Sequence, residues 1–124
     1  MANKEISIWL IDDEPLFSSG LARLINDMGI EKTLLFNDPA SILGELKAGA
    51  SNLPEIILID ISMPGINGIK LTRMIHKQFP AIWIIGVSSY KSDVVIANLL
   101  EAGAVAFVSK NESVDKLLKV ISEV

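Results

Sequence analysis

Ile56-Ile57-Leu58-Ile59-Asp60 decides the fold class of this chain, together with the similar run Ile6-Ser7-Ile8-Trp9-Leu10-Ile11-Asp12-Asp13 near its start. Both runs are short, almost wholly apolar, and end in acidic residues. Strands that are apolar on both sides are typical of parallel sheets covered by helices on both faces. If the two strands are adjacent, their carboxyl ends meet at one edge of the sheet. We therefore expect Asp12, Asp13 and Asp60 to lie together.

Composition limits the classes of protein that fit this chain. Its 124 residues, of which 50% are hydrophobic, predict one domain over residues 1–124 with a substantial core. A net charge of −4 argues against a nucleic-acid surface within the chain, and the lack of cysteine excludes disulfides and thiolate chemistry. The first apolar run is too short for a signal peptide or a membrane span. These features predict a cytoplasmic protein with no membrane partner.

Apolar runs alternate with amphipathic stretches of helical length along the whole chain. The expected strands are Ile6–Ile11, Thr33–Phe36, Ile56–Asp60, Ile82–Val87 and Val105–Val108. Signals for the start of a helix follow each strand, at Pro15, Asp38-Pro39, Asn67, Ser92-Asp93 and Ser113. This alternation predicts an α/β fold with a doubly wound, five-stranded parallel sheet, (βα)5 and flavodoxin-like, in strand order 2-1-3-4-5.

The acidic cluster suits phosphoryl chemistry. Carboxylate oxygens are the ligands that Mg²⁺ prefers, and Asp12 and Asp13 supply negative charge for such an ion. Asp60 is a candidate nucleophile toward phosphorus, as carboxylates are in aspartyl-phosphate chemistry. Lys110 follows the fifth expected strand and is a candidate to neutralise the oxygens of the transferred phosphoryl group. Ser88 follows the fourth expected strand and is a candidate to donate a hydrogen bond to one of these oxygens.

Each of these residues also has an ordinary structural interpretation. Asp13 suits a helix cap, Asp60 suits the start of a turn, and Lys110 suits a surface position. What favours the functional interpretation is the set, because suitable groups follow or end four of the five expected strands.

Four separated motifs resemble those of the response regulator receiver domain of two-component signalling. They are Ile11-Asp12-Asp13-Glu14-Pro15, the run from Leu58 to Gly68, Val87-Ser88-Ser89-Tyr90, and the stretch from Glu101 to Lys110 that contains Phe107-Val108-Ser109-Lys110. They occur in the family's order and spacing from one end of the chain to the other.

This resemblance implies a role for each matched residue. Asp60 corresponds to the phosphoacceptor, and Asp12, Asp13, Asp60 and the backbone carbonyl of Ser62 to the Mg²⁺ ligands. Lys110 corresponds to the family's lysine, Ser88 to its hydroxyl switch residue, and Phe107 to the aromatic residue that rotates with it. The implied phosphoryl donor is a sensor histidine kinase or a histidine phosphotransfer protein. The domain would catalyse only its own phosphorylation and dephosphorylation, and is otherwise not an enzyme.

Departures from the family pattern bear on the output. Asn111 follows the lysine where the family usually has proline, which resembles the receivers of LuxR-type helix-turn-helix regulators. That likeness implies control of transcription, with DNA bound only through an output domain absent from this chain. The alternatives are a stand-alone receiver and a binding module that works without phosphorylation, and Asn111 after Lys110 favours the receiver half of a longer regulator over both. The apolar stretch from Val94 to Leu100 predicts a contact surface, for a homodimer or for an output domain.

Two enzyme or carrier classes fit the sequence less well. A haloacid dehalogenase-type hydrolase needs a second aspartate two residues after the nucleophile, where this chain has Ser62. A flavodoxin-like flavin carrier needs a loop rich in Ser, Thr and Gly after the first strand, where this chain has Asp12-Asp13-Glu14-Pro15. The binding module that works without phosphorylation would be a pseudo-receiver, a receiver domain that typically lacks one of the acidic residues or the lysine. This chain has Asp12, Asp13, Asp60 and Lys110.

Overall fold

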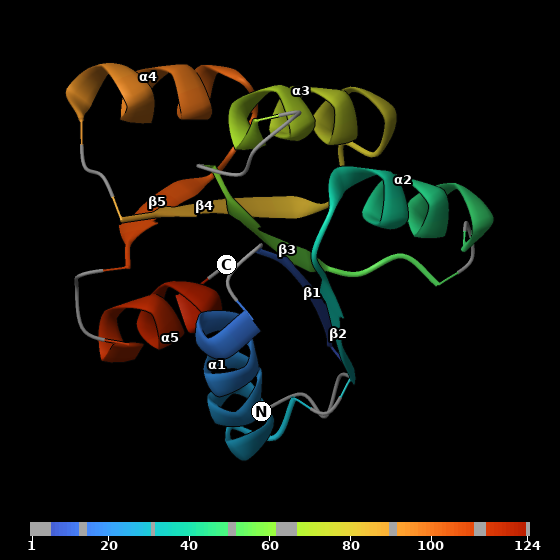
Figure 1. Cartoon of the computed structure of the whole chain (residues 1–124), viewed down its shortest axis with the longest axis vertical. Coiled ribbons are helices and arrows are strands. Elements are labelled where there is room, and N and C mark those ends of the chain that lie inside the picture. The colour runs from blue at the N-terminus through green and yellow to red at the C-terminus, as the bar shows by residue number, and fades with distance from the viewer. Residues whose placement is uncertain are drawn as a thin grey trace.

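A computed structural model describes residues 6–12, 15–30, 32–49, 52–61, 67–89, 92–110 and 114–123 of the chain. In these residues five strands and five helices alternate, and all the strands are parallel in one sheet of order β2-β1-β3-β4-β5. Helices α2, α3 and α4 cover one face of the sheet, and α1 and α5 cover the other (Figure 1). The predicted fold class and strand order are confirmed.

The strands lie within one residue of the predicted bounds. They are β1 (Ser7–Ile11), β2 (Lys32–Phe36), β3 (Ile56–Asp60), β4 (Trp83–Ser88) and β5 (Ala106–Ser109). The predicted start of β4 at Ile82 was wrong, because the Ile82 amide donates to the Phe79 carbonyl in the preceding turn at 3.1 Å. Ser88 belongs to the strand because it pairs in register with Ser109 of β5.

The helices begin at or directly after the predicted start signals, of which Ser113 lies outside the described residues. They are α1 (Pro15–Asp27), α2 (Pro39–Ala48), α3 (Gly68–Gln78), α4 (Asp93–Glu101) and α5 (Val114–Glu123). The side chains of Asp38, Asn67 and Ser92 cap α2, α3 and α4 by accepting a hydrogen bond from a backbone amide in the first turn. Gly29 and Gly103 follow α1 and α4 with φ of 97° and 122°, where other residues would be strained.

Alternation along the strands divides the core into two layers. Ile57 and Ile59 of β3 pack toward α2, α3 and α4, whereas Ile56 and Leu58 pack toward α1 and α5. This alternation also decides on which side of the sheet each polar residue at the carboxyl edge lies. Within the part of the chain that the structure describes, no helix is long and apolar enough to cross a membrane.

Candidate functional site

The carboxyl edge of the sheet collects the predicted polar residues. Asp60 is the last residue of β3, Ser88 is the last of β4, and Asp12 and Lys110 directly follow β1 and β5. The pairing of β1 with β3, of β3 with β4 and of β4 with β5 brings these four strand ends side by side. The structure thus brings together residues that lie as far as 98 positions apart in the sequence.

Main-chain hydrogen bonds continue the sheet beyond the strand ends and fix this edge. The Lys110 amide donates to the Ser88 carbonyl at 2.8 Å, and the Ile61 amide donates to the Val87 carbonyl at 3.0 Å. The Asp12 amide donates to the Phe36 carbonyl at 3.1 Å. Because their backbones are held as extensions of the ladder, the side chains at these positions have defined directions.

Lys110 bridges the two described carboxylates. Its Nζ lies 2.9 Å from Oδ2 of Asp12 and 3.5 Å from Oδ2 of Asp60. Asp12 and Asp60 are only 5% and 3% exposed, and the Lys110 side chain is 7% exposed. Buried charges are costly unless they are paired, so the ammonium group stabilises two carboxylates that would otherwise repel each other.

The floor beneath these carboxylates is apolar. Asp12 and Asp60 line a small hollow of about 10 Å³ together with apolar side chains from α1, β1, β3 and β4. The lining apolar residues are Leu10, Ile11, Leu21, Leu58 and Val87. Such a floor lowers the local dielectric and strengthens the attraction of the site for cations.

Two of the four predicted metal ligands can be compared with the structure. Asp12 and Asp60 are brought together, whereas Asp13 and Ser62 lie outside the described residues. In the described ranges no cluster of three or more His, Cys, Asp or Glu residues is placed to hold a metal ion. Two buried carboxylates bridged by one ammonium group nevertheless form a donor set that fits Mg²⁺, since hard oxygen ligands and water are what this ion prefers.

The two predicted switch residues lie on the other side of the sheet. Ser88 lies on the same face of β4 as Ile84 and Gly86, the face that α4 covers, and it is only 1% exposed. Phe107 of β5 is half-buried and packs against the core layer beneath α2, α3 and α4. The charged residues Asp12, Asp60 and Lys110 lie on the opposite face of the sheet, the same face as the core layer next to α1 and α5.

Two glycines near the site were missed by the sequence-based prediction. A Cβ at Gly68, the first residue of α3, would lie 2.3 Å from Cα of Ile61, just after Asp60. A Cβ at Gly86, inside β4, would lie 2.2 Å from Cδ2 of Leu99 on α4. The available signal for Gly86 was a glycine within an otherwise apolar strand, which often marks a close approach by another element.

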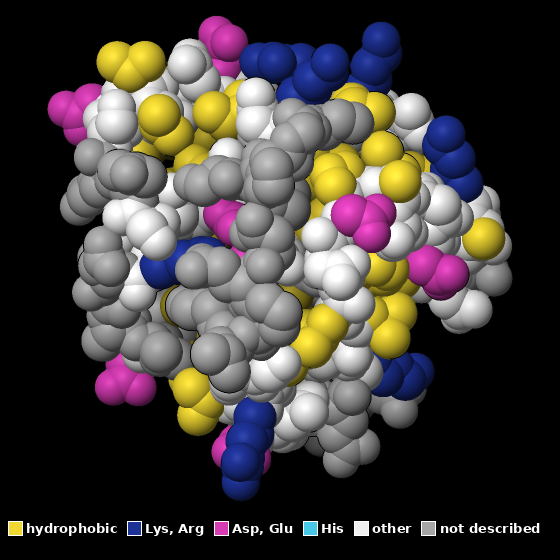
Figure 2. All heavy atoms as spheres, in the orientation of Figure 1, with side chains coloured by type: hydrophobic (Ala, Val, Ile, Leu, Met, Phe, Trp, Pro, Cys, Tyr) yellow, Lys and Arg dark blue, Asp and Glu magenta, His cyan; other side chains and the backbone are white. Residues whose placement is uncertain are grey.

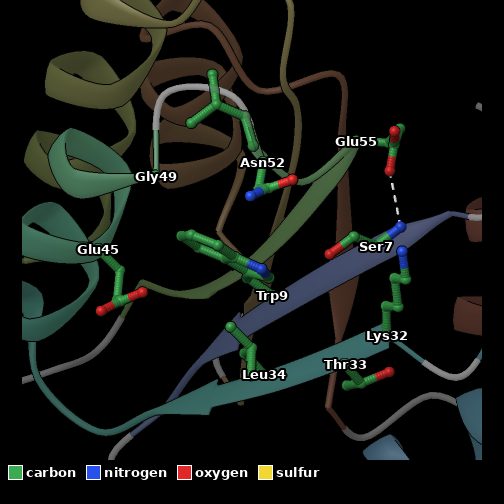
Figure 3. Close-up of a pocket in the computed structure, with 10 residues that line it drawn as sticks. Ser7, Trp9, Lys32, Thr33, Leu34, Glu45, Gly49, Asn52 and Glu55 are labelled. Atoms are coloured by element: carbon green, nitrogen blue, oxygen red, sulfur yellow. Dashed lines mark hydrogen bonds between the residues drawn. The ribbon is translucent and has the colours of Figure 1, made fainter.

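A larger groove lies away from this edge of the sheet. A groove of about 630 Å³ runs beside β2 and α2, where Trp9, Leu34, Glu45 and Asn52 line it (Figure 3). Ser7, at the start of β1, donates its amide to Oε1 of Glu55 at 2.7 Å on the rim of this groove. Because it opens at the amino ends of β1 and β2, the groove is separate from the carboxyl edge that holds the acidic residues.

Comparison with protein families identifies the chain. The model described as "Response regulator receiver domain" matches residues 8–122. The chain belongs to the response regulator receiver domain family. The predicted resemblance is therefore confirmed, and the domain is one module of the two-component response regulators.

Named relatives of this receiver domain are longer proteins. It is 26% identical over 123 residues to response regulator GacA of Pseudomonas protegens, covering 94% of this chain and 54% of that protein. It is 28% identical over 127 residues to response regulator UvrY of Escherichia coli K12, covering 96% and 54%. The receiver domain thus spans about half the length of the relatives it matches.

Solved receiver structures share the fold. The signal receiver domain of the putative response regulator NarL from Mycobacterium tuberculosis superposes with a TM-score of 0.84 at 23% identity, covering 97% of this chain and 95% of that one. The isolated receiver of RcsB from Salmonella enterica serovar Typhimurium, solved with phosphomimetic BeF3−, gives 0.82 at 22% identity, covering 96% and 87%. At these identities the likeness concerns the fold alone.

Proposed function

We propose that this receiver domain accepts a phosphoryl group on Asp60 from a phosphohistidine of a sensor kinase or phosphotransfer protein. The observation that supports this most is the bridging of Asp12 and Asp60 by Lys110 at 2.9 and 3.5 Å in a largely buried site. A bound Mg²⁺ would supply charge neutralisation for the transferred oxygens. Its ligands would be Asp12, Asp13, Asp60 and the backbone carbonyl of Ser62.

In the proposed transfer, an oxygen of the Asp60 carboxylate attacks phosphorus. The new O–P bond forms as the N–P bond of phosphohistidine breaks, and the electron pair of that bond returns to the imidazole nitrogen. Lys110 then leaves Asp60 for an oxygen of the phosphoryl group, while Ser88 donates its hydroxyl to another. In the separate hydrolysis step, water attacks phosphorus while the bond between Asp60 and phosphorus breaks, so that the Asp60 carboxylate is restored and inorganic phosphate is released.

The switch would act through the layer beneath α4. Once Ser88 turns toward the phosphoryl group, the space beside it opens for Phe107, and α4 shifts with both side chains. Phosphorylation would thereby bias an element with two packing arrangements. A Ser88→Ala variant should still be phosphorylated, but amide exchange in α4 should respond much less to phosphorylation. An unchanged response of α4 in this variant would contradict the coupling.

Intact-protein mass spectrometry after incubation with acetyl phosphate and Mg²⁺ tests the chemistry. We expect the wild-type protein to gain one phosphoryl group, only with Mg²⁺, and Asp60→Asn to gain none. A folded wild-type protein that stays unmodified, with a phosphohistidine donor as well as with acetyl phosphate, would indicate a binding module that works without phosphorylation.

The output of the protein is proposed from its relatives. The domain spans about half of GacA and UvrY, and RcsB from Salmonella enterica serovar Typhimurium has been solved bound to the promoter rprA. These relatives support control of transcription through a DNA-binding output domain. Electrophoretic mobility shift with the full-length protein, with and without phosphorylation, tests this proposal.

A second copy of the domain is the proposed partner for the outer surface of α4. Val94 is 68% exposed and Leu100 is 45% exposed, and hydrophobic side chains gather over α4 (Figure 2). Exposed apolar patches often mark contact sites. Sedimentation equilibrium should therefore show self-association that Val94→Asp weakens, and a monomer in both phosphorylation states would contradict this.

A further inference from the structure

Leu99 of α4 fills the space above Gly86 of β4. A Cβ built on Gly86 would lie 2.2 Å from Cδ2, 3.0 Å from Cδ1 and 3.1 Å from Cγ of Leu99. Real Cβ atoms do not approach other atoms so closely, so Leu99 occupies the place that any side chain at position 86 would take. The absence of a side chain at position 86 is what allows α4 to lie this close to the sheet.

This contact lies beside both proposed switch residues. Gly86 pairs in register with Phe107 of β5, and it precedes Ser88 by two residues on the same face of β4. Phe107 and Val95 are partly buried and pack against the core layer that contains Leu99. The Leu99 side chain therefore lies on the surface across which Phe107 must turn and α4 must shift.

Leu99 is also the most deeply buried described residue of α4. It is 0% exposed, and among the described residues of this helix it alone is buried. Val94 and Leu100 are 68% and 45% exposed, and Val95 is only partly buried. The position of α4 over β4 thus depends largely on one side chain and on the glycine beneath it.

We propose that the contact of Leu99 with Gly86 holds α4 in the position that it takes in the unphosphorylated domain. This positioning contact then sets the equilibrium between the two packing arrangements of α4. While Leu99 covers Gly86, it limits the space into which Phe107 can turn. Displacing Leu99 frees that space and favours the arrangement that phosphorylation stabilises. The inference rests on the proposed function at Asp60, and it adds two residues that do not touch the phosphoryl group.

Gly86→Ala tests this inference because it adds one methyl group where Leu99 lies. We expect faster amide exchange in α4 of the unphosphorylated variant, with exchange in β1 and β3 unchanged. We also expect beryllofluoride with Mg²⁺ to bind about fivefold or more tightly, because part of the displacement has already occurred. Gly86→Ala/Leu99→Ala should raise the affinity little beyond Leu99→Ala alone, because two changes that act through one contact do not add.

Gly44→Ala is the matched control, because a Cβ at Gly44 on α2 has no atom within 4 Å. It should leave α4 exchange and beryllofluoride affinity unchanged. If Gly86→Ala does not fold, Leu99→Ala alone tests the inference. Removing the side chain that covers Gly86 should also raise the affinity for beryllofluoride with Mg²⁺.

Four outcomes would overturn the inference. The first is wild-type exchange and affinity in Gly86→Ala. The second is a double variant whose affinity exceeds that of Leu99→Ala by the full increase seen in Gly86→Ala, which would mean that the two residues act independently. The third is a change in α4 exchange without a change in affinity, which indicates a packing effect and not control of the switch. The fourth is absence of beryllofluoride binding in every folded variant, including wild type, which refutes the proposed function at Asp60 and the coupling with it.

Discussion

Replacing Lys110 by Met should destabilise the domain strongly in the absence of Mg²⁺. The ammonium group lies 2.9 Å from Oδ2 of Asp12 and 3.5 Å from Oδ2 of Asp60. At an effective dielectric constant of 20, these distances correspond to attractions of about 6 and about 5 kcal/mol. The cost of burying the three charges offsets much of this attraction. Removing one partner from a buried ion pair nevertheless costs about 3–5 kcal/mol, because the buried carboxylates lose the ammonium group that lies between them.

Urea unfolding measures this loss. With a slope of about 1.5 kcal/mol/M, a loss of about 3 kcal/mol lowers the midpoint by about 2 M. Mg²⁺ at about 100 times its dissociation constant should restore about 2.7 kcal/mol, because a divalent cation replaces the missing charge. Asp60→Asn/Lys110→Met should lose less stability than Lys110→Met, because only one buried carboxylate is then deprived of the ammonium group.

Lys119→Met is the matched control, since Lys119 is an exposed lysine on α5. Its midpoint should stay close to that of wild type. The reasoning is refuted if Lys110→Met and Lys119→Met unfold at the same urea concentration without Mg²⁺. It is also refuted if the double variant is less stable than Lys110→Met.

Three further predictions concern the helices around the site. Asn67→Ala removes a cap whose Oδ1 accepts a backbone hydrogen bond at 2.9 Å, and it should lower the free energy of unfolding by about 1 kcal/mol in urea titration. Gly68→Ala places a Cβ 2.3 Å from Cα of Ile61 and should cost about 1–3 kcal/mol; a variant as stable as wild type in thermal unfolding would contradict this. The backbone amide of Ser41, followed by its hydroxyl, holds the pKa of the Asp38 carboxyl below its usual value. The cap at Asp38 therefore stabilises α2 at pH values above the usual carboxyl pKa, and this stabilisation is lost as the pH falls through the lowered pKa of Asp38. The protection of α2 amides from hydrogen exchange should accordingly decrease over that pH range in the wild-type protein and should not do so in Asp38→Asn.

Much of the architecture could be predicted because local signals and global fold agree. The predicted bounds of β3 match the observed ones at both ends, and Asp38, Asn67 and Ser92 cap their helices as expected. Each of these features depends on residues a few positions apart. Pattern and spacing are sufficient to identify such features.

Contacts between distant elements were harder to predict. The bridging of Asp12 and Asp60 by Lys110 requires the register of three strand pairs among four strands, which no local pattern contains. Likewise, the packing of Leu99 against Gly86 depends on how closely α4 approaches the sheet. Leu34 of β2, an apolar residue in a predicted strand, is 46% exposed because β2 lies at the edge of the sheet.

The sheet separates the charged residues from the proposed switch residues. Asp12, Asp60 and Lys110 lie on the face of the sheet that α1 and α5 cover. Ser88 and Phe107 lie on the other face, with the core layer beneath α4. Substitutions on the outer surface of α4 can therefore change what this surface contacts while Asp12, Asp60 and Lys110 keep their places. Ser88 is the residue through which the proposed phosphoacceptor would still reach that surface.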